Sequence, residues 1–384
     1  MISRNFLTDA YPKKQLGDVV EFLDSMRRPV TESDRRAGGY PYYGANGLQG
    51  TIDDFIFDEP LVLLAEDGGH FGTPDRGIAY RVSGKTWVNN HAHVLRPREC
   101  VDLGFLCRVL ENYDVTPWVT GTTRGKLTQA GAAQIVVPLP PLPEQRRIAE
   151  ILDKADALRA KRRAALAQLD TLTQSIFLDM FGDPISNPRG WPTVRFEQLC
   201  ERVTVGIVVQ PASYYVSEGV PALRSLNIRP GKIVLDDLVY FSKSDNDTKL
   251  AKTKLRAGDV VLVRSGQPGT AAVVPPELDG VNAIDILIAT PDQQLTNPTF
   301  LCEFFNSAGG RDLVLSRQRG QVQKHLNVGS LNQAILPLPS IDLQCEFAAR
   351  VAAVERYREA ELASSTALDA LFASLQHRAF RGEL

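Results

Sequence analysis

The sequence lacks long apolar runs, and this limits the places where the protein can work. No segment reaches the roughly 18 uninterrupted apolar residues that a membrane-spanning helix needs. The first residues, Met1-Ile2-Ser3-Arg4-Asn5, do not have the apolar stretch of a signal peptide. We therefore expect a cytoplasmic protein that does not contact a membrane.

Cysteine is scarce and scattered along the chain. The five cysteines never form a Cys-x-x-Cys pair, which argues against a disulfide framework and against a structural zinc site. His70, His91 and His93 have no neighbouring set of ligands at a recognised spacing. We expect reduced thiols and no metal site.

Motifs for catalysis and cofactor binding are also missing. Asn297-Pro298-Thr299-Phe300 lacks the second proline of the Asn-Pro-Pro-Phe motif of adenine methyltransferases, and no glycine-rich cofactor loop follows a strand. Gly84-Lys85-Thr86 lacks the leading glycine of a phosphate-binding loop. No Ser or Cys nucleophile stands in a recognised motif. The sequence therefore predicts no catalytic residue and no cofactor in this chain.

Neither sign of charge is in clear excess. The 43 basic and 45 acidic residues give a net charge of −2, whereas a nucleic-acid binder that works alone is usually more basic. DNA binding would require positive charge to be concentrated on one face, or partner subunits to supply phosphate contacts. The length of 384 residues predicts two or three folding units.

An internal repeat is the clearest feature that the sequence does have. Residues 121–183 align without a gap on residues 320–382 at a constant offset of 199, so that Gln145 meets Gln344. Between these segments, roughly 20–120 and 200–319, the two halves look unrelated. A duplicated frame that carries two different inserts is the simplest description, because two copies of one catalytic domain should also match in the middle.

Each copy of the frame predicts one long helix. The first begins near Pro143 and stops at Gly182, about 38 residues later, and the second runs from about Asp342 to Phe380. Apolar residues recur with the 3.5-residue period of a coiled coil, so we expect the helices to pack antiparallel about a pseudo-two-fold axis. The alternative is that each helix covers the core of its own domain. The predicted seam consists of Ile148, Ile151, Ala155, Leu158, Ala165, Leu169, Leu172 and Ile176 in the first helix, and of Phe347, Val354, Tyr357, Leu368, Leu371 and Leu375 in the second.

Charged residues interrupt both apolar seams. Arg162 lies midway along the first seam and Glu361 midway along the second. One polar pair in an apolar seam can fix the register of two helices at some cost in stability. We therefore expect Arg162 and Glu361 to meet near the axis.

The frame resembles a known family. The stretch from Pro138 to Ala149, Pro-Leu-Pro-Pro-Leu-Pro-Glu-Gln-Arg-Arg-Ile-Ala, with Phe181-Gly182-Asp183-Pro184 after the helix, is similar to the region between target-recognition domains in type I restriction-modification DNA specificity subunits. The second frame departs from that pattern, with Leu343 where the first has Glu144 and with Arg381-Gly382 where the Phe-Gly-Asp-Pro ending would fall. The inserts resemble two classes of such domains, the first through Tyr42-Tyr43-Gly44-Ala45-Asn46-Gly47, Glu66-Asp67-Gly68 and the segment Trp87 to Leu95, the second through Gly219 to Arg224 and Leu255 to Val260.

This resemblance, which covers nearly the whole chain, implies an α+β fold. Two mixed α/β target-recognition domains, residues 1–141 and 184–340, would be separated by two long antiparallel helices, residues 142–183 and 341–384. The apolar runs Leu61–Ala65 and Val260–Val263 predict buried strands inside these domains.

The resemblance also implies a function and partners. The subunit would have no catalytic activity and would recognise a bipartite, asymmetric site on double-stranded DNA. Two methyltransferase subunits would bind S-adenosylmethionine and methylate adenine, and endonuclease/translocase subunits would cleave. ATP and Mg are expected in partner subunits.

Candidate DNA-binding residues follow from the side chains that contact base edges and phosphates, namely Arg, Lys, Asn, Gln and His. Residues 120–126 and 317–325 form two loops in which small or polar residues accompany cations, which suits phosphate binding. Any one candidate could instead be structural, since Asn46-Gly47, for example, suits a turn. The candidates are Tyr43, Asn46, Arg76, Asn89, Asn90, His91, Arg124 and Lys126 in the first domain, and Arg224, Asn227, Arg264, Gln267, Arg317, Arg319, Lys324 and His325 in the second.

The predicted helices have a length that suits DNA. A helix of about 38 residues is roughly 57 Å long, and one turn of B-DNA is roughly 34–36 Å, so the helices could set the distance between two half-sites. Two alternatives stay open. The chain could be an enzyme with an unrecognised active site, or a structural adaptor that joins partners through its helices and does not bind DNA.

Overall fold

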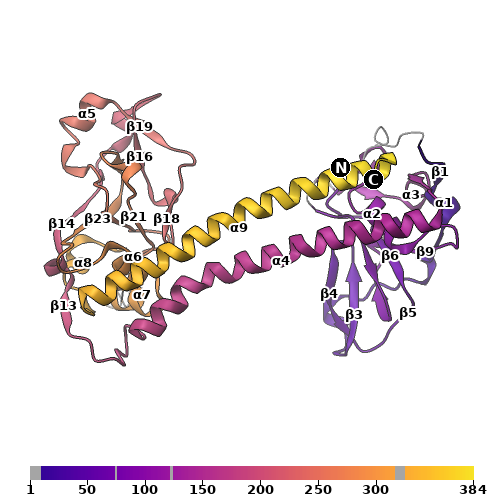
Figure 1. The fold of residues 1–384 in the computed structure, drawn as a ribbon, viewed down its shortest axis with the longest axis horizontal. Coiled ribbons are helices and arrows are strands. Elements are labelled where there is room, and N and C mark those ends of the chain that lie inside the picture. The colour runs from indigo at the N-terminus through magenta and orange to yellow at the C-terminus, as the bar shows by residue number, and fades with distance from the viewer. Residues whose placement is uncertain (1–9, 74–75, 122–123, 316–324) are drawn as a thin grey trace. The chain divides into compact units, whose positions relative to one another are not determined.

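The computed structural model describes residues 10–73, 76–121, 124–315 and 325–384. The chain forms two compact units: unit 1 contains Met1–Arg163 and Ala363–Leu384, and unit 2 contains Ala164–Leu362. Two long helices, α4 (Leu142–Phe181) and α9 (Ile341–Arg381), each contribute one part to unit 1 and the other part to unit 2 (Figure 1). These helices are the two that the sequence predicts. Among the described helices, none has the length and apolar composition required to cross a bilayer.

Unit 1 is built on two four-stranded sheets. The first has the order β2-β9-β6-β7, with antiparallel neighbours throughout, and the second has the order β4-β3-β8-β5, in which β3 and β8 are parallel. The pairs β1-β12 and β10-β11 are separate. The strands are β1 (Lys13–Gln15), β2 (Val20–Phe22), β3 (Tyr40–Gly44), β4 (Gly47–Ile52), β5 (Phe57–Asp58), β6 (Leu61–Ala65), β7 (Ala79–Val82), β8 (Lys85–Val88), β9 (Ala92–Pro97), β10 (Val119–Thr120), β11 (Lys126–Leu127) and β12 (Val136–Pro138), and the shorter helices are α1 (Leu16–Val19), α2 (Leu103–Leu110) and α3 (Gln129–Ala133).

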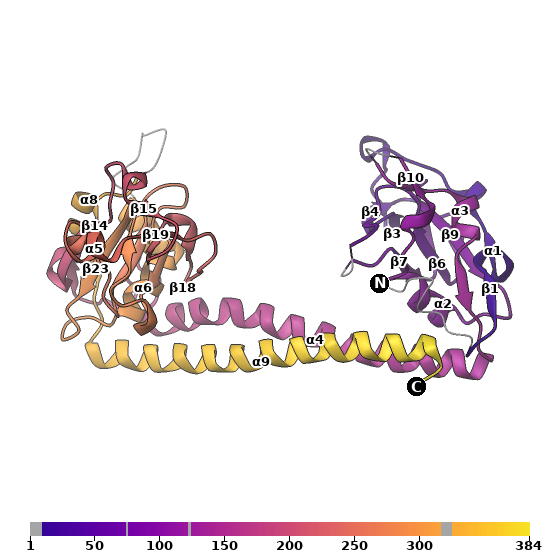
Figure 2. The ribbon, with the colours of Figure 1, turned by 90° about the horizontal axis from the view of Figure 1, so that it is seen from above.

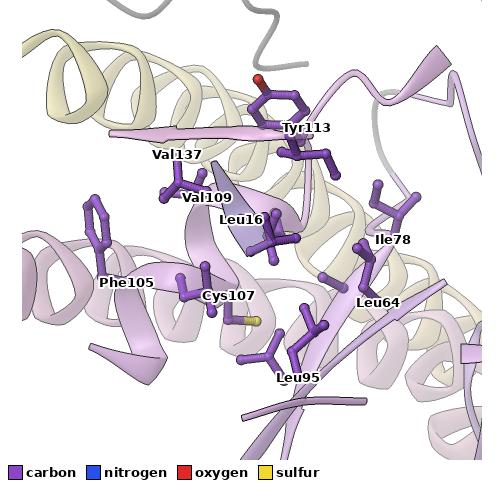
Figure 3. Packing of buried hydrophobic residues seen from close by; sticks show 14 of the residues in the cluster. Leu16, Leu64, Ile78, Leu95, Phe105, Cys107, Val109, Tyr113 and Val137 are labelled. Atoms are coloured by element: carbon purple, nitrogen blue, oxygen red, sulfur yellow. The ribbon is translucent and has the colours of Figure 1, made fainter. Parts of the chain in front are cut away.

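The core of unit 1 joins the first sheet to the helices α2, α4 and α9. Strand β6 is fully buried, as the apolar run predicts. Side chains of the sheet and of α2, among them Leu64, Leu95 and Phe105, pack in one cluster (Figure 3). Ile148 of α4 and Phe380 of α9 belong to the same cluster. The long helices therefore complete the hydrophobic core of this unit.

Unit 2 is again built on two four-stranded sheets. The first has the order β14-β23-β20-β21 and is antiparallel, and the second has the order β15-β19-β16-β22, in which β16 and β22 are parallel. The strands are β13 (Thr193–Arg195), β14 (Cys200–Val205), β15 (Tyr215–Val216), β16 (Val220–Leu223), β17 (Ile228–Arg229), β18 (Lys232–Ile233), β19 (Val239–Phe241), β20 (Val260–Val263), β21 (Ala271–Val273), β22 (Asn282–Ala283), β23 (Ile286–Pro291) and β24 (Ile335–Pro337), and the shorter helices are α5 (Lys243–Asp247), α6 (Pro298–Asn306), α7 (Ala308–Leu315) and α8 (Val328–Asn332).

Aromatic side chains dominate the part of the unit 2 core that contacts the long helices. Phe181 of α4 lies with its ring centroid 4.9 Å from that of Phe300 in α6 and 5.3 Å from that of Phe347 in α9. Phe177 and Phe304 belong to the same buried cluster. Large aromatic surfaces in edge contact provide strong apolar burial, so α4, α6 and α9 form one packed body.

The two units share a topology that their sequences do not reveal. In the first sheet of unit 1, β2-β9-β6-β7, the strand that comes first in the chain lies beside the fourth, and the second and third follow. The first sheet of unit 2, β14-β23-β20-β21, has the same order. In both, a helix follows the last of these strands, and a short helix precedes the strand that leads into the long helix. The two inserts therefore differ in sequence but share this strand order.

Pairing of the long helices is antiparallel and follows the internal repeat. In unit 1, Nε of Arg159 in α4 lies 2.6 Å from Oδ1 of Asp369 in α9. In unit 2, Nε of Arg358 in α9 lies 3.2 Å from Oδ1 of Asp170 in α4. At the repeat offset of 199 residues, Arg159 corresponds to Arg358 and Asp170 corresponds to Asp369. The two ion pairs are therefore equivalent, as a pseudo-two-fold relation requires. The predicted antiparallel arrangement is confirmed.

The predicted seam is only partly correct. Ile148, Phe347 and Val354 are buried as expected, but Leu152 and Phe372 are buried in place of their neighbours Ile151 and Leu371. Leu158, Leu172, Tyr357 and Leu371 are exposed to between 38% and 57% of their surface. Both helices also cover the cores of the domains, so their buried faces follow those contacts rather than one continuous seam.

The two residues predicted to meet between the long helices, Arg162 and Glu361, belong to different units. Arg162 belongs to unit 1 and Glu361 to unit 2, on the two sides of the boundary between them. Glu361 is buried and Arg162 half-buried. The contact between them stays a prediction.

Candidate nucleic-acid interface

Four of the predicted DNA-binding residues of the first domain converge on one turn, residues 66–68, directly after β6. Asp67 Oδ1 lies 2.8 Å from Nη2 of Arg124 and 2.5 Å from Nδ1 of His91. Lys126 Nζ lies 3.0 Å from Glu66 Oε1, and the amide of Asn46 donates a hydrogen bond of 3.0 Å to the Gly68 carbonyl. We call Asn46, Glu66, Asp67, His91, Arg124 and Lys126 the unit 1 cluster.

Backbone pairing positions this cluster. Glu66 donates its amide to the His91 carbonyl and accepts from the amide of Leu127, and the amide of Gly68 bonds to the carbonyl of Gly125. The turn, the start of β9 and the strand β11 are therefore held together. Figure 2 shows β10, which pairs with β11, at the end of unit 1 away from α4 and α9. Arg124 and Lys126 are exposed there.

A largely buried ion-pair network, formed by Asp24, Arg27, Glu66 and His93, lies on the interior side of the cluster. Arg27 Nη1 donates a hydrogen bond of 2.5 Å to Glu66 Oε2. His93 Nδ1 lies 2.6 Å from Asp24 Oδ2, and His93 Nε2 lies 2.9 Å from the Leu127 carbonyl oxygen. The His93 ring therefore links Asp24 to the backbone of β11.

The carboxylates of this network stay ionised. Burial alone would raise the pKa of Asp24, but hydrogen bonds from His93 and from the Val94 amide outweigh it and hold the pKa below its usual range. Burial also opposes ionisation of Glu66, but hydrogen bonds from Arg27 and Lys126 lower its pKa. Ligand atoms of Asp24, Glu66 and His93 lie within 4.8 Å of one another, a spacing that a cation could use. Arg27 and Lys126 already neutralise Glu66, so we interpret these residues as an ion-pair network.

Unit 2 has a cluster at the equivalent position, formed by Arg264, Ser265, Asp285 and His325. Arg264, the first residue after β20, forms an ion pair with Asp285 and places Nη2 2.7 Å from His325 Nε2. Ser265 Oγ lies 2.7 Å from His325 Nδ1. We call these four residues the unit 2 cluster.

The equivalence of the two clusters rests on backbone contacts. The amide of Leu127 donates to the Glu66 carbonyl, and the amide of Leu326, 199 residues further, donates to the Arg264 carbonyl. Glu66 and Arg264 therefore occupy the same place after the equivalent strand. One is acidic and the other basic, so the same scaffold presents opposite charges at this position.

Several other predicted residues are accessible but lie outside these contacts. Asn90, Arg76 and Gln267 are exposed. Tyr43 is half-buried beside Tyr80, and Arg224 pairs with Asp237. Arg317, Arg319 and Lys324 fall outside the described residues.

Two predicted residues have structural roles instead. Asn227 has no exposed surface, and its side chain bonds to the Arg224 amide and to the carbonyls of Val234 and Asp236. Asn89 is buried and bonds to Gln49 and to the His91 amide. Their amide groups stabilise turns, so we remove both from the candidates.

Acidic residues are the part of the site that sequence reasoning missed. In the sequence, Glu66 and Asp67 belong to a segment that resembles the family, and Asp24 and Asp285 belong to no recognised motif. Residue types that donate hydrogen bonds to DNA predict the cations, whereas these carboxylates position the cations. Glu66 directly follows the buried strand β6 and Asp285 directly precedes the mostly buried strand β23, and this placement is the signal that the sequence offers for these two acids.

A cavity of about 760 Å³ in unit 1 has walls from α2, α4 and α9. Its charged groups pair with one another: Arg108 Nη1 lies 3.0 Å from Glu111 Oε2, and Arg159 pairs with Asp369. Burial raises the pKa of Glu111 to about 7, although Arg108 opposes the shift. No Ser, Cys, His or Lys is among the described residues that line it. The described charged groups of the cavity thus form ion pairs that join α2, α4 and α9.

Comparison with known proteins identifies relatives of both the sequence and the fold. Residues 9–168 match the model of the type I restriction modification DNA specificity domain. A putative type I restriction enzyme specificity subunit of Haemophilus influenzae is 38% identical over 148 residues, which are 38% of this chain and 38% of that protein. The EcoBI specificity subunit of Escherichia coli is 28% identical over 280 residues, 65% of this chain and 58% of that protein. The aligned segments thus span less than two thirds of either relative.

The fold is similar over almost the whole chain. The crystal structure of a type I restriction-modification S subunit from M. genitalium superposes with a TM-score of 0.60, covering 98% of this chain and 97% of that one at 12% identity. At this identity the match concerns the fold. The sequence match of residues 9–168 and the fold match lead to the same family, and this chain is similar in sequence and in fold to the type I restriction-modification DNA specificity subunits.

Proposed function

We propose that this chain recognises a bipartite, asymmetric sequence on double-stranded DNA, with one half-site read by each unit. The observation that carries the proposal is the pair of equivalent clusters after β6 and β20. Both combine polar and cationic side chains with backbone turns, as base and phosphate contacts require. Because Glu66 in one is replaced by Arg264 in the other, the two half-sites should differ in sequence.

The long helices would bind two methyltransferase subunits. Leu158 and Leu371 are exposed on the helices in unit 1, and Leu172 and Tyr357 in unit 2. The offset of 199 residues relates Leu158 to Tyr357 and Leu172 to Leu371. Large apolar side chains that stay exposed on a helix are available for contact with a protein partner. Two equivalent surfaces fit two copies of the same partner.

In this proposal the chemistry belongs to the partners. The methyltransferase subunits would hold S-adenosylmethionine and methylate adenine, and the endonuclease/translocase subunits would use ATP and Mg. This chain would contribute DNA binding and the arrangement of subunits. Its two clusters would select the sequence at which the partners act.

Mapping of methylated bases in the genome tests the proposal. With the gene intact, one bipartite adenine motif should be methylated, and deletion of the gene should abolish that motif alone. An unchanged set of motifs would contradict DNA recognition by this chain.

Two other functions, a structural adaptor and an enzyme, can be distinguished from DNA recognition by measuring DNA retention by the complex and the activity of the isolated chain. A structural adaptor would assemble the complex without sequence-specific retention of DNA. An enzyme with an unrecognised site would bind a methyl donor or modify DNA as an isolated chain.

A further inference from the structure

In the unit 1 cluster, the cations Arg124 and Lys126 pair with carboxylates, and the His91 ring lies beside one. Asp67 lies within 2.8 Å of Arg124 and within 2.5 Å of His91, while Glu66 lies 3.0 Å from Lys126. Arg27 adds a second cation to Glu66 from the interior. Arg124 and Lys126 thus present their charge beside negative charge at the surface.

These carboxylates are built into the fold rather than mobile at the surface. Glu66 is buried and Asp67 keeps 18% of its side chain exposed, whereas Arg124 keeps 60%. Asp67 also forms a backbone bridge with Lys126 in β11. Arg124 and Lys126 are therefore the more exposed partners. The less exposed carboxylates of Asp67 and Glu66 hold them in place from the protein side.

A nearby carboxylate has two effects on a DNA-contacting cation. It fixes the direction of the guanidinium or ammonium group, which favours contacts of defined geometry such as those to base edges. It also offsets the positive charge that attracts phosphates, and phosphate attraction supplies essentially all of non-specific DNA binding. Both effects favour discrimination between DNA sequences over a high overall affinity for DNA.

Unit 2 also pairs a carboxylate with the cation of its cluster, but there the acid is the more exposed partner, since Arg264 keeps 13% of its side chain exposed and Asp285 keeps 46%. Asp285 pairs with Arg264, whose other terminal nitrogen contacts His325. Asp285 adopts a positive φ of 49°, a conformation that Asp and Asn tolerate better than most residues. The backbone there is shaped to bring the carboxylate to Arg264.

We propose that Glu66 and Asp67 in unit 1 and Asp285 in unit 2 are positioning residues that increase sequence discrimination by orienting the DNA-contacting cations and reducing their attraction for phosphates. This inference rests on the proposed DNA-reading function. It also explains how a chain with a net charge of −2 can serve that function, since acids and bases are matched within the sites themselves.

The test compares Asp67→Asn with the unaltered chain, each as the full chain assembled with its methyltransferase subunits. The probes are a duplex that carries the mapped methylation motif and a scrambled duplex of the same length and composition. Dissociation constants are measured at several salt concentrations. For the scrambled duplex, the variant should bind more tightly, and its slope of log K against log salt should steepen by about one for the single cation released. The ratio of specific to non-specific affinity should fall.

Glu21→Gln is the matched control. It removes one carboxylate of unit 1 that pairs with Arg96, and Arg96 keeps its second partner Glu59. The affinity ratio and the salt slope should equal those of the unaltered complex. This control separates a local effect at the cluster from a general change in charge.

Asp285→Asn is measured in the same way for unit 2. If Asp67→Asn does not fold, this second variant tests the proposed role of the carboxylates. Unchanged slopes and ratios in the folded variants, or equal losses of affinity for both duplexes, would overturn the proposal. Failure of the DNA-reading function is distinguishable, because the unaltered complex itself would then bind both duplexes equally.

Discussion

Single glutamine side chains connect each recognition domain to its long helix. Gln145 Oε1 accepts a hydrogen bond of 2.7 Å from the Asp102 amide at the start of α2, and its amide donates to the carbonyls of Cys100 and Pro140. Gln344, its repeat equivalent, accepts from the Asn297 amide at the start of α6. Both glutamines are fully buried. The repeat therefore preserves the junctions even where the sequences of the domains have diverged.

Replacing Gln145 with alanine should destabilise unit 1 strongly. Three backbone groups would lose their partner, and the buried one, the Pro140 carbonyl, would cost about 1–3 kcal/mol when left unsatisfied. We expect the free energy of unfolding in urea to fall by about 2–4 kcal/mol. Gln134→Ala, at an exposed position, should change it by less than about 0.5 kcal/mol. Similar effects of the two substitutions would show that the junction contributes little.

Glu111 should make the stability of unit 1 depend on pH. Its pKa in the folded protein is about 7, above the ordinary value of 4.5, so the folded state binds more protons between these values. Stability contributed by this group is therefore lost as pH rises from about 4.5 to 7. In Glu111→Gln, the melting temperature should decline less across that window than in the unaltered chain. Glu99→Gln, at an exposed position, should follow the unaltered profile, and parallel profiles for all three proteins would contradict the prediction.

Residue type and spacing predicted part of the candidate site. Asn46, His91, Arg124 and Lys126 lie far apart in sequence, yet they were selected because their side chains suit DNA contacts, and the fold brings them to one turn. Asn227 was selected by the same rule and is buried. Burial depends on tertiary packing, which no local sequence pattern encodes. Residue type alone therefore cannot distinguish an accessible side chain such as Arg124 from a buried one such as Asn227.

At the scale of the element, the ends of the long helices were predictable and their buried faces were not. A proline near the first turn and Gly182 after the last define α4, because both residues restrict the backbone locally. The face of the helix depends on its neighbours. Leu152 packs into the unit 1 core although Ile151 fits the coiled-coil period equally well. A 3.5-residue pattern indicates a helix with a partner but does not say which of two adjacent residues faces it.

The common topology of the two units was also beyond prediction. Hydrogen bonds of the backbone define the order of strands, and many different side chains are compatible with one order. Only single strands such as β6 and β20, which are continuous apolar runs, were visible in the sequence.

The predicted pair Arg162–Glu361 can be tested by charge exchange. If the two side chains interact, Arg162→Glu should lower the melting temperature of the full chain, since it places two acids together. The double variant Arg162→Glu with Glu361→Arg should recover most of that loss. Additive effects of the two single changes would show that the residues do not interact.

At the scale of the whole molecule, the helices should set the number of unread base pairs between the half-sites. The repeat relates Ala164 to Ala363, so a matched insertion places four residues after each. Four residues add about 6 Å and nearly one helical turn, which corresponds to about two base pairs. The mapped methylation motif should gain about two unread base pairs and keep both half-sites.

Insertion in α4 alone is the control for this prediction. It should displace the ion pairs Arg159–Asp369 and Arg358–Asp170 relative to each other and lower stability. A matched insertion that alters a half-site while the gap stays constant would refute the role of the helices as a spacer.

The division of the chain into units has a consequence for its synthesis on the ribosome. Unit 2 is a continuous stretch, residues 164–362, whereas unit 1 includes residues 363–384, and Phe372, Ala379 and Phe380 are buried in its core. Translation proceeds from the N-terminus, so unit 2 can finish folding while the first unit to be synthesised still lacks part of its interior. The nascent first unit therefore exposes the apolar surface that α9 later covers, and during that interval it should be the part of the chain most in need of a chaperone.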